Sequence, residues 1–509
     1  MNIVPKPYLI EPSEGSFAFR ADMKVRTSLP VIADMFGGAA ETSPIIFRKA
    51  DTEWDYVLKI TPSGVEATAS DDEGLFHAAV TLRQLTGGKK EADIPACTVF
   101  DKPRYAYRAG MLDVCRHFYG VDVVKKLIDT MAMYKFNFLH FHVSDDQGFR
   151  LRIDALPKLH RVGSVRKSTC GDGKPHGGYY TKAQIKEIVD YAAERYIQIL
   201  PEIDIPGHTR AVIAAYPELS CSGKPTDVAT WFGIHSKVLC AGKEKVYEAL
   251  DVIFAEMAEM FPCKYFHLGG DEVAKLEWAK CPDCAETVRR EGLKDLEQLQ
   301  GYFTNRAIKL LKKYGKTPIL WNEALNSEML DPSAAIQYWT TDKASAERVA
   351  KAVCEEGRKV VMSRCNPYYL DYPCGMHSLK AMYMLEPEEE LGSAGRDGIM
   401  GVECPLWTEH ISEEKDLFEH FYPRAIAVAE TGWSAPGKDY ADFEARLKEV
   451  LFPLDEKGVA HMPVEKCNPG KLKGALQASA FGMKAQRRCD VTSARNWRST
   501  RLRYPQKTK

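Results

Sequence analysis

Residues 265–272 read Tyr-Phe-His-Leu-Gly-Gly-Asp-Glu, and this stretch decides how the rest of the sequence is interpreted. The apolar residues of 265–268 predict a buried strand, and the glycine pair after them permits unusual backbone angles and leaves room for a ligand. Asp271 and Glu272 follow where the strand opens into a loop, which is where active sites collect in parallel α/β proteins. The same two acids could begin a helix as capping residues, so these residues alone leave capping and catalysis open.

Apolar runs of the same kind alternate with amphipathic stretches throughout the sequence after residue 104. With 265–268, the predicted strands are 109–112, 136–141, 197–203, 318–321, 336–339, 359–362 and 399–402. The predicted helices lie near 121–134, 181–196, 243–261, 296–314 and 343–357. Parallel strands need helical crossovers and eight strands close a sheet, so the pattern favours an α/β fold of the (β/α)8 TIM barrel type. A doubly wound open sheet is the alternative.

The regions on either side of 104–437, the predicted catalytic barrel, have different patterns. Residues 1–103 contain short β-branched runs and one helical repeat over 73–85, which predicts a small α+β accessory domain before the barrel. For 438–509 we expect a C-terminal helix and a basic tail, because Lys and Arg far outnumber the single acid, Asp490, after residue 465. Few apolar residues recur after residue 475, so this tail is expected to be disordered.

The composition is that of an ordinary globular protein, with 45% hydrophobic and 27% charged residues and a formal net charge of -1. This balance gives no reason to expect nucleic acid or a membrane as a partner. The first residues lack the pattern of a secretory signal, so the chain as written is expected to be cytoplasmic.

The 14 cysteines are expected to be reduced, because they are scattered through predicted strands and helices. Only Cys281 and Cys284 have the spacing of a metal-binding pair. No second pair of cysteines or histidines follows at the distance found in zinc fingers, so a surface turn is the favoured interpretation there and zinc the alternative.

Polar and aromatic side chains follow the predicted strands, and in a barrel they would meet at one mouth. They are Asp113, Arg116, His117, His142, Asp145, Asp146, Glu202, Asp204, His208, Asp271, Glu272, Asn322, Glu323, Trp339, Tyr368, Tyr369, Glu403, Trp407 and Glu409. Each alone could cap a helix or pack in the core. Together they suit a sugar, because aromatic rings stack on its apolar face while carboxylates and arginines bind its hydroxyls.

The adjacency of Asp271 and Glu272 restricts the chemistry. Consecutive side chains near a strand end diverge, so this pair is poorly placed to flank one glycosidic bond as acid and opposed nucleophile about 5–5.5 Å apart. One of the two carboxylates is therefore expected to have another task.

Five motifs, in order between about residues 50 and 435, resemble glycoside hydrolase family 20, the β-N-acetylhexosaminidases. They are Arg-Ala-Gly-Met-Leu-Asp at 108–113 with Arg116-His117, His142-x-x-Asp145-Asp146, Asp204-x-Pro206-Gly207-His208, His267-x-Gly269-Gly270-Asp271-Glu272 and Trp407-x-Glu409. The resemblance implies an N-terminal α/β domain followed by a (β/α)8 barrel. It also implies an exo-acting enzyme that removes terminal β-linked GlcNAc or GalNAc from glycans or chitooligosaccharides with retention of configuration.

In that family the nucleophile is the substrate's own 2-acetamido group, an exception to the scheme with two catalytic carboxylates. By resemblance, Glu272 would protonate the leaving oxygen, Asp271 would orient the acetamido N-H, and Tyr369 would donate to its carbonyl oxygen. The residues expected to bind the sugar are Arg108 and Glu409 at the outer hydroxyls, Trp321, Trp339 and Trp407 around the acetamido group, and Asp145 and His208 near the acid. No cofactor and no metal are implied.

Two other functions remain open at this stage. A sugar-binding barrel without catalysis would share the aromatic residues, and an enolase-like barrel enzyme would place acids at strand ends around Mg²⁺. The only partner expected is a small-molecule or oligosaccharide substrate with a terminal N-acetylhexosamine. The sequence fixes neither the preference for GlcNAc or GalNAc nor the oligomeric state, for which a dimer is one option.

Overall fold

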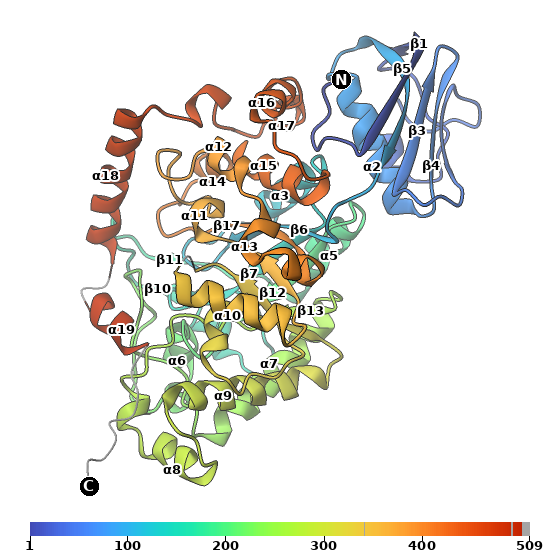
Figure 1. The fold of residues 1–509 in the computed structure, drawn as a ribbon. Helices are drawn as coiled ribbons and strands as arrows, with labels where there is room; N and C mark the ends of the chain where they lie inside the picture. The colour runs from blue at the N-terminus through green and yellow to red at the C-terminus, as the bar shows by residue number, and fades with distance from the viewer. Residues whose placement is uncertain (341, 490–491, 501–509) are drawn as a thin grey trace.

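The computed structural model describes residues 1–340, 342–489 and 492–500, and a closed barrel of parallel strands forms its centre (Figure 1). In order around the barrel the strands are β12 (Gln198–Glu202), β13 (Tyr265–His267), β14 (Thr317–Trp321), β15 (Ala335–Tyr338), β16 (Val360–Met362), β17 (Ile399–Leu406), β6 (Tyr107–Asp113) and β7 (Phe138–His142). All eight predicted strands are confirmed, and the open-sheet alternative is wrong. Short, mostly apolar runs form these strands because helices cover their outer face.

Five helices that surround the barrel lie close to their predicted positions, namely α3 (Val121–Ala132), α5 (Lys182–Ala193), α7 (Glu244–Met260), α9 (Leu296–Lys312) and α10 (Lys343–Cys354). Two further helices, α14 (Glu414–Phe421) and α15 (Arg424–Trp433), were not predicted. Helix α5 begins at a capping box in which Thr181 and Gln184 exchange hydrogen bonds. The amphipathic repeat therefore predicted the positions of the first five helices.

Short elements occupy the long loops between the strands and helices of the barrel. They are β8 (Ser144–Asp145), β9 (Gly148–Phe149), α4 (Lys158–Arg161), β10 (Val165–Arg166), β11 (His176–Gly177), α6 (Arg210–Ala215), η1 (Pro217–Leu219), η2 (Trp278–Lys280), α8 (Pro282–Arg290), η3 (Asn322–Asn326), α11 (Cys365–Tyr368), α12 (Leu379–Met384), α13 (Pro387–Leu391) and η4 (Ser393–Gly398). The loops that follow the strands are thus partly ordered by their own secondary structure, which positions functional side chains better than a free loop would.

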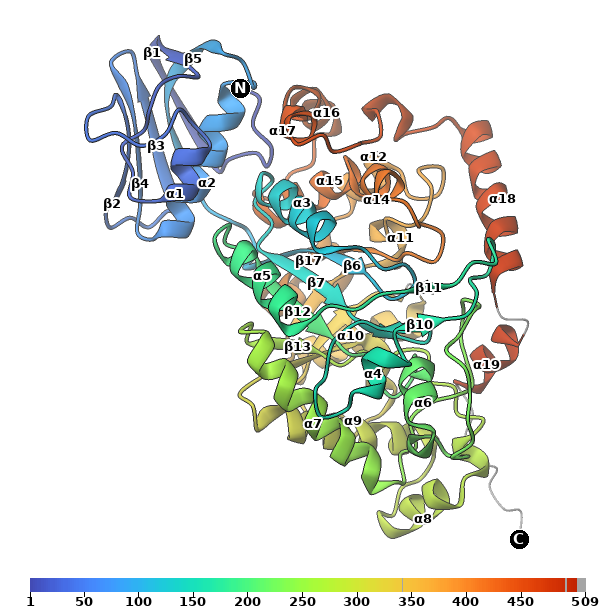
Figure 2. The ribbon, with the colours of Figure 1, turned by 180° about the vertical axis from the view of Figure 1, so that it is seen from behind.

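The N-terminal domain is a five-stranded sheet in the order β1-β5-β3-β4-β2. Its elements are β1 (Leu9–Arg20), α1 (Pro30–Asp34), β2 (Ile45–Lys49), β3 (Tyr56–Thr61), β4 (Gly64–Ala69), α2 (Asp72–Leu85) and β5 (Glu91–Asp101). Figure 2 shows α2 on the face of the sheet that is turned toward the barrel. The predicted α+β accessory domain is present.

Asp101, at the end of β5, fixes this domain to the barrel through a buried ion pair. Its carboxylate lies 2.9 Å from Nζ of Lys135, and both side chains are fully buried. The hydroxyl of Tyr56 and Nε1 of Trp433 donate to the same carboxylate at 2.6 and 2.9 Å. Groups from both domains therefore share one buried charge, which makes their relative position specific.

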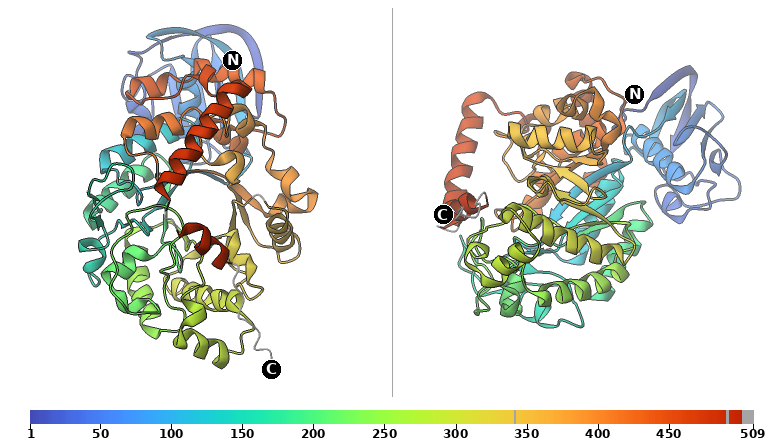
Figure 3. Two further views of the ribbon diagram at one scale, coloured as in Figure 1. Left: turned by 90° about the vertical axis from the view of Figure 1, so that its left-hand side faces the viewer. Right: turned by 60° about the horizontal axis from the view of Figure 1, so that its bottom comes forward.

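The C-terminal segment contains α16 (Tyr440–Glu449), α17 (Phe452–Glu456), η5 (Val464–Lys466), α18 (Lys471–Arg488) and α19 (Ser493–Ser499). The expected C-terminal helix is present, but the expectation of disorder after residue 475 is wrong for 475–489 and 492–500, while 490–491 and 501–509 lie outside the described residues. Viewed along the barrel, α18 and α19 lie in front of its ring (Figure 3, left). Among the described residues no helix combines the length and apolar character needed to span a membrane.

Asp101→Ala should destabilise the protein strongly, because Lys135 would keep a buried charge without its partner. We expect the free energy of unfolding, measured by urea denaturation, to fall by about 3–5 kcal/mol. Asp93→Ala, on an exposed position of the same strand, is the matched control and should change it by less than about 0.5 kcal/mol. Equal stability of the two variants would contradict the role given to this ion pair.

Candidate active site

A cavity of about 370 Å³ lies at the mouth of the barrel, where the parallel strands end. The predicted site residues that line it are His208, Asp271, Glu272, Trp339, Tyr369, Trp407 and Glu409. Arg116, Asp204 and Asp371 also line it, and Phe481, Ala485, Cys489 and Ser493 form a wall from the C-terminal segment. The topology of the barrel thus gathers carboxylates, a histidine and aromatic rings from distant parts of the sequence into one cavity.

The backbone after β13 turns sharply to present Asp271 and Glu272 to this cavity. Gly269 and Gly270 have φ angles of +64° and +101°, and a Cβ atom on Gly269 would lie 1.9 Å from Oδ1 of Asp204. The N-H of Gly270 donates to that Asp204 oxygen at 3.1 Å. Glu272 itself has a φ of +48°, a strained conformation that is typical of functional sites.

His208 lies between two pairs of carboxylates. Its Nδ1 is 3.4 Å from Asp145 and 3.3 Å from Asp146, while its Nε2 is 3.4 Å from Glu272 and 3.8 Å from Asp271. Burial alone would lower the pKa of His208, but Asp145 and the other facing carboxylates hold it well above its ordinary value. A protonated His208 therefore links Asp271 and Glu272 to Asp145 and Asp146.

Asp271 has a raised pKa and a buried carboxylate oxygen without a hydrogen-bond partner among the described residues. Burial raises the pKa of Asp271 to about 6, with His208 opposing this effect and Glu272 adding to it. Its Oδ1 is buried and has no hydrogen-bond partner among the described residues, and the same is true of Nε1 of Trp339. Buried polar atoms are normally satisfied, so an acceptor and a donor left unpaired in one cavity indicate that a polar ligand completes them.

Aromatic rings form another part of the cavity wall. Trp339 and Tyr369 stack with an interplanar angle of 5° and a centroid distance of 6.1 Å, and Tyr369 meets Trp407 edge to face at 6.2 Å. Trp321 lies beneath this wall, because it is buried, packs 6.0 Å from Trp407 and donates its Nε1 proton to Glu202 at 2.9 Å. Trp339 and Trp407 thus line the cavity as predicted, whereas Trp321 packs against Trp407 and does not line it itself.

Arg116, and not Arg108, is the arginine of the cavity. Nη2 of Arg116 lies 2.7 Å from Asp145 and 4.0 Å from Glu409, and its guanidinium lies over the ring of Trp407 at 4.9 Å. Asp145 is fully buried behind it. Arg116 therefore bridges a buried acid and Glu409 at the cavity wall.

The prediction that Arg108 binds the substrate is wrong, because Arg108 stands near the start of β6 whereas the cavity lies where the strands end. Its guanidinium is buried, donates to the carbonyl oxygens of Lys135 and Tyr105 at 2.8 and 2.9 Å, and lies over the ring of Trp433 at 4.9 Å. Arg108 thus supports the contact between the strand and the neighbouring loops.

Glu323 was present among the strand-end residues but received no role from the sequence. Its carboxylate accepts a hydrogen bond from the backbone N-H of Glu272 at 2.7 Å, and this bond helps to hold Glu272 in its strained backbone conformation. Burial, with the nearby charges of Glu272 and Asp271, raises the pKa of Glu323 to about 8. The signal that could have found it was its place directly after β14, at the same mouth as the other acids.

Two groups of acids and histidine in the site have donor atoms close enough for a metal ion, namely Asp145 with Asp146 and His208, and Asp204 with His208 and Asp271. In the first group the guanidinium of Arg116 already pairs with Asp145. In both groups a histidine with a raised pKa stands where a metal would need a neutral ring nitrogen. The donor chemistry therefore favours a proton-bearing network over a metal centre.

Comparison with known proteins places this geometry in a family. Residues 105–436 match the description "Glycosyl hydrolase family 20, catalytic domain", and residues 45–102 match "Glycosyl hydrolase family 20, domain 2". The chain belongs to glycosyl hydrolase family 20. The resemblance inferred from the five sequence motifs is thereby confirmed, and so is the order of the two domains within this family 20 protein.

Relatives of this family 20 protein include two bacterial enzymes and a solved structure. A β-hexosaminidase of Porphyromonas gingivalis is 34% identical over 96% of this chain and 67% of that protein. One of Akkermansia muciniphila is 38% identical over 77% of this chain and 82% of that protein. The structure of a mutant Streptomyces plicatus β-hexosaminidase in complex with its product GlcNAc has a TM-score of 0.80 at 33% identity, covering 90% of this chain and 96% of that one.

Substitution of Arg116 should lower activity, whereas substitution of Arg108 should lower the stability of the fold. Arg116→Lys keeps the charge but loses the planar fork, and we expect kcat/KM for the nitrophenyl glycoside that the protein hydrolyses fastest to fall about 100-fold. Arg108→Lys should lower the melting temperature and leave kcat/KM within about threefold at temperatures where the protein is folded. A loss of kcat/KM in Arg108→Lys as large as that in Arg116→Lys would contradict this assignment.

Asp271→Asn should stabilise the fold in a way that depends on pH. The pKa of Asp271 is raised from 3.8 to about 6, so the folded state holds this proton more tightly than the unfolded state does. Ionised Asp271 therefore costs stability above about pH 6, and this cost disappears below about pH 4. We expect urea denaturation to show the variant more stable than the wild type by on the order of 1–3 kcal/mol at pH 7.5 and nearly equal to it at pH 4.

The exposed Asp93→Asn is the control for this experiment and should show no comparable difference between the two pH values. An advantage of Asp271→Asn that is as large at pH 4 as at pH 7.5 would show that its cause is packing and not ionisation.

Proposed function

We propose that this family 20 protein is an exo-acting β-N-acetylhexosaminidase that removes terminal β-linked GlcNAc or GalNAc by retaining, substrate-assisted hydrolysis. One observation carries the proposal: Asp271 and Glu272 stand next to each other on one side of an aromatic-walled cavity, and the buried Oδ1 of Asp271 lacks a partner among the described residues. The names of the relatives support the same activity.

The adjacency of the two acids requires a nucleophile from elsewhere. Neighbouring residues cannot act from opposite faces of one glycosidic bond, but they can serve a substrate that carries its own nucleophile. The carbonyl oxygen of the 2-acetamido group attacks the anomeric carbon while the bond to the leaving oxygen breaks, and Glu272 gives that oxygen its proton. Glu272 then takes a proton from water as the water opens the cyclic intermediate, which restores the acid and retains the configuration.

Asp271 orients the nucleophile in this scheme. Its unpaired Oδ1 accepts the acetamido N-H and stabilises the positive charge that develops there, while Tyr369 donates to the acetamido carbonyl oxygen. Trp339 and Trp407, with Trp321 beneath, surround the methyl group and hold the arm in the reactive geometry. Holding an intramolecular nucleophile in place in this way supplies on the order of 7–11 kcal/mol in ideal cases.

The exo mode of action follows in this proposal from Arg116 and Glu409. Both line the cavity and lie 4.0 Å apart, and they can bind the outer hydroxyls of a terminal sugar. Asp145, which pairs with Arg116, also faces His208. One buried acid thus connects recognition of the sugar ring to the group beside the catalytic acid.

The two rival functions fit these observations less well. An enolase-like site needs a lysine or histidine base beside Mg²⁺, but none of the described residues that line the cavity is a lysine. Of the two histidines that line it, His208 is held between carboxylates and is protonated. A binding module without catalysis would not need the strained backbone of Glu272 or the acids that hold His208.

Hydrolysis of three nitrophenyl glycosides tests the proposed function. We expect turnover of the β-GlcNAc and β-GalNAc compounds and a kcat/KM at least about 1000-fold lower for the β-glucoside, because a 2-hydroxyl cannot replace the amide as nucleophile. Comparable hydrolysis of the glucoside would overturn the substrate-assisted mechanism, and no hydrolysis of any of the three would favour the binding module.

The variant Glu272→Gln, measured in the same assay, checks the acid. Nitrophenolate leaves without much help from a proton, whereas a sugar alcohol does not. We therefore expect a kcat lower by about 10²–10⁴-fold on N,N′-diacetylchitobiose and a smaller loss on the nitrophenyl compound. Equal losses on the two substrates would contradict the role of Glu272 as proton donor.

A further inference from the structure

Four cysteines meet in the loops beside the active site. Cys221 and Cys240 belong to the loop between β12 and α7, and Cys281 and Cys284 belong to the loop between β13 and α9. Sγ of Cys240 lies 3.7 Å from Sγ of both Cys281 and Cys284, and Sγ of Cys221 lies 3.8 Å from that of Cys284. All four sulfur atoms lie within 4.8 Å of one another.

These distances do not describe disulfides, whose sulfur atoms are bonded at about 2.05 Å. They describe the edges of a tetrahedron. Four sulfur ligands at about 2.3 Å from one zinc ion would be separated by about 3.8 Å, and four thiolates are a common ligand set of structural zinc sites. The three measured edges agree with this value within 0.1 Å.

We propose that Cys221, Cys240, Cys281 and Cys284 bind one Zn²⁺ ion in a closed tetrahedral site. On binding, each thiol loses its proton and forms one bond to zinc, so the centre carries two net negative charges. Four protein ligands leave no open position for water or substrate, so the site is structural and takes no part in the chemistry of hydrolysis.

The surroundings of the sulfurs suit this charge. Cys281 is the N-cap of α8 and Cys284 lies in its first turn, where the positive end of the helix dipole stabilises a thiolate. Nζ of Lys243 donates to the carbonyl of Ser220, next to Cys221, at 2.6 Å. Cys240, Cys281 and Cys284 are buried, so water does not stabilise the negative charge of their thiolates. The N-terminus of α8 supplies part of this stabilisation instead.

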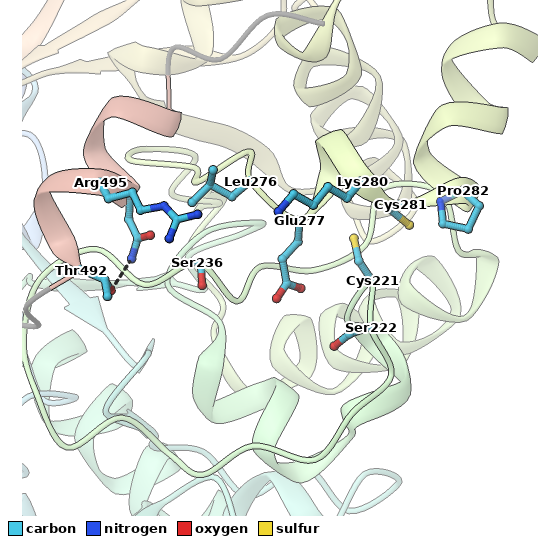
Figure 4. Close-up of a pocket in the computed structure, with 11 residues that line it drawn as sticks. Cys221, Ser222, Ser236, Leu276, Glu277, Lys280, Cys281, Pro282, Thr492 and Arg495 are labelled. Carbon is cyan, nitrogen blue, oxygen red and sulfur yellow. Dashed lines mark hydrogen bonds between the residues drawn. The ribbon is translucent and has the colours of Figure 1, made fainter. Parts of the chain in front are cut away.

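The cluster also has a route by which an ion can enter. Cys221 and Cys281 stand at the edge of a cavity of about 520 Å³, and Figure 4 shows these two side chains between the loops that carry them, with Lys280 and Glu277 nearby. Behind them Trp278 is buried and donates its Nε1 proton to the carbonyl of Leu239 at 2.9 Å. One side of the site is thus accessible and the other is packed.

The metal would fix the relative position of the loop between β12 and α7 and the loop between β13 and α9. Leu239, next to Cys240, donates its N-H to the carbonyl of Pro206 at 3.0 Å, two residues before His208. A Cβ atom on Gly207 would lie 3.0 Å from the carbonyl oxygen of Asp271, so the two loops touch at the active site itself. The inference concerns the fold and holds whether or not the proposed activity is correct.

Metal analysis of the untagged full-length protein, purified without added metal or chelator, tests the proposal. We expect about one zinc per chain by inductively coupled plasma mass spectrometry. Replacement by Co²⁺ should give the thiolate-to-metal charge-transfer band and the visible bands of a tetrahedral sulfur site. Both measurements use the wild-type protein, so they decide the question even where a cysteine variant fails to fold.

Cys240→Ser should lose the zinc and lower the melting temperature, whereas the matched variant Cys263→Ala, which alters a buried cysteine outside the cluster, should keep one zinc per chain. Removal of the metal from the wild type should lower the melting temperature, and added Zn²⁺ but not Mg²⁺ should restore it.

Three results would overturn the proposal. They are a wild-type protein without zinc, a stoichiometric iron ion in its place, or disulfides among the four cysteines detected by mass after alkylation without reduction. Retention of zinc by Cys240→Ser at wild-type stoichiometry would also overturn it, because the ion would then be bound elsewhere.

Discussion

The carboxylate of Glu202, buried at the end of β12, forms hydrogen bonds and ion pairs with side chains of three other barrel strands, and the arrangement of the barrel depends on these contacts. It accepts hydrogen bonds from Nδ1 of His142 and Nε1 of Trp321, and ring nitrogens of His140 and His267 lie 3.1 and 2.9 Å from its oxygens. These partners come from β7, β13 and β14. Burial would raise the pKa of Glu202, but the facing histidines hold it well below its ordinary value. A buried charge is tolerated only with such partners, so the strands that carry them have one arrangement.

The same network leads outward to the catalytic groups. Nε2 of His142 lies 3.0 Å from Asp145, and Asp145 in turn pairs with Arg116 and faces His208, which lies beside Glu272. Acids and bases alternate along this path, so each buried charge has an opposite neighbour. The buried charges of the core and those of the cavity are therefore connected, and the position of Glu272 depends on charged groups that do not line the cavity themselves.

Much of this architecture could be predicted from the sequence because it rests on local patterns. The eight strands are short apolar runs, and their ends carry the polar residues. The pattern does not show to which end of the barrel a side chain points, or which residues that are distant in the sequence lie close together in the fold. Arg108 lies near the start of β6 and Arg116 follows its end, and only the course of β6 shows which of the two reaches the mouth. The sequence pattern identified only Cys281 and Cys284 as a possible metal-binding pair. Long stretches of sequence separate this pair from Cys221 and Cys240, so the cluster of four could not be predicted. In α18 the exposed Leu472 and Leu476 weaken the periodic signal of a helix that contacts the barrel on one side only.

The C-terminal segment decides when the cavity acquires its full outline. Phe481, Ala485, Cys489 and Ser493 form one wall of it, and Arg446 of α16 donates to the carbonyl of Ile3 in the N-terminal segment. A ribosome makes the barrel strands before either contact is possible. The cavity of the nascent protein therefore lacks this wall, and it acquires the outline described here only when α18 and α19 have been synthesised and have docked.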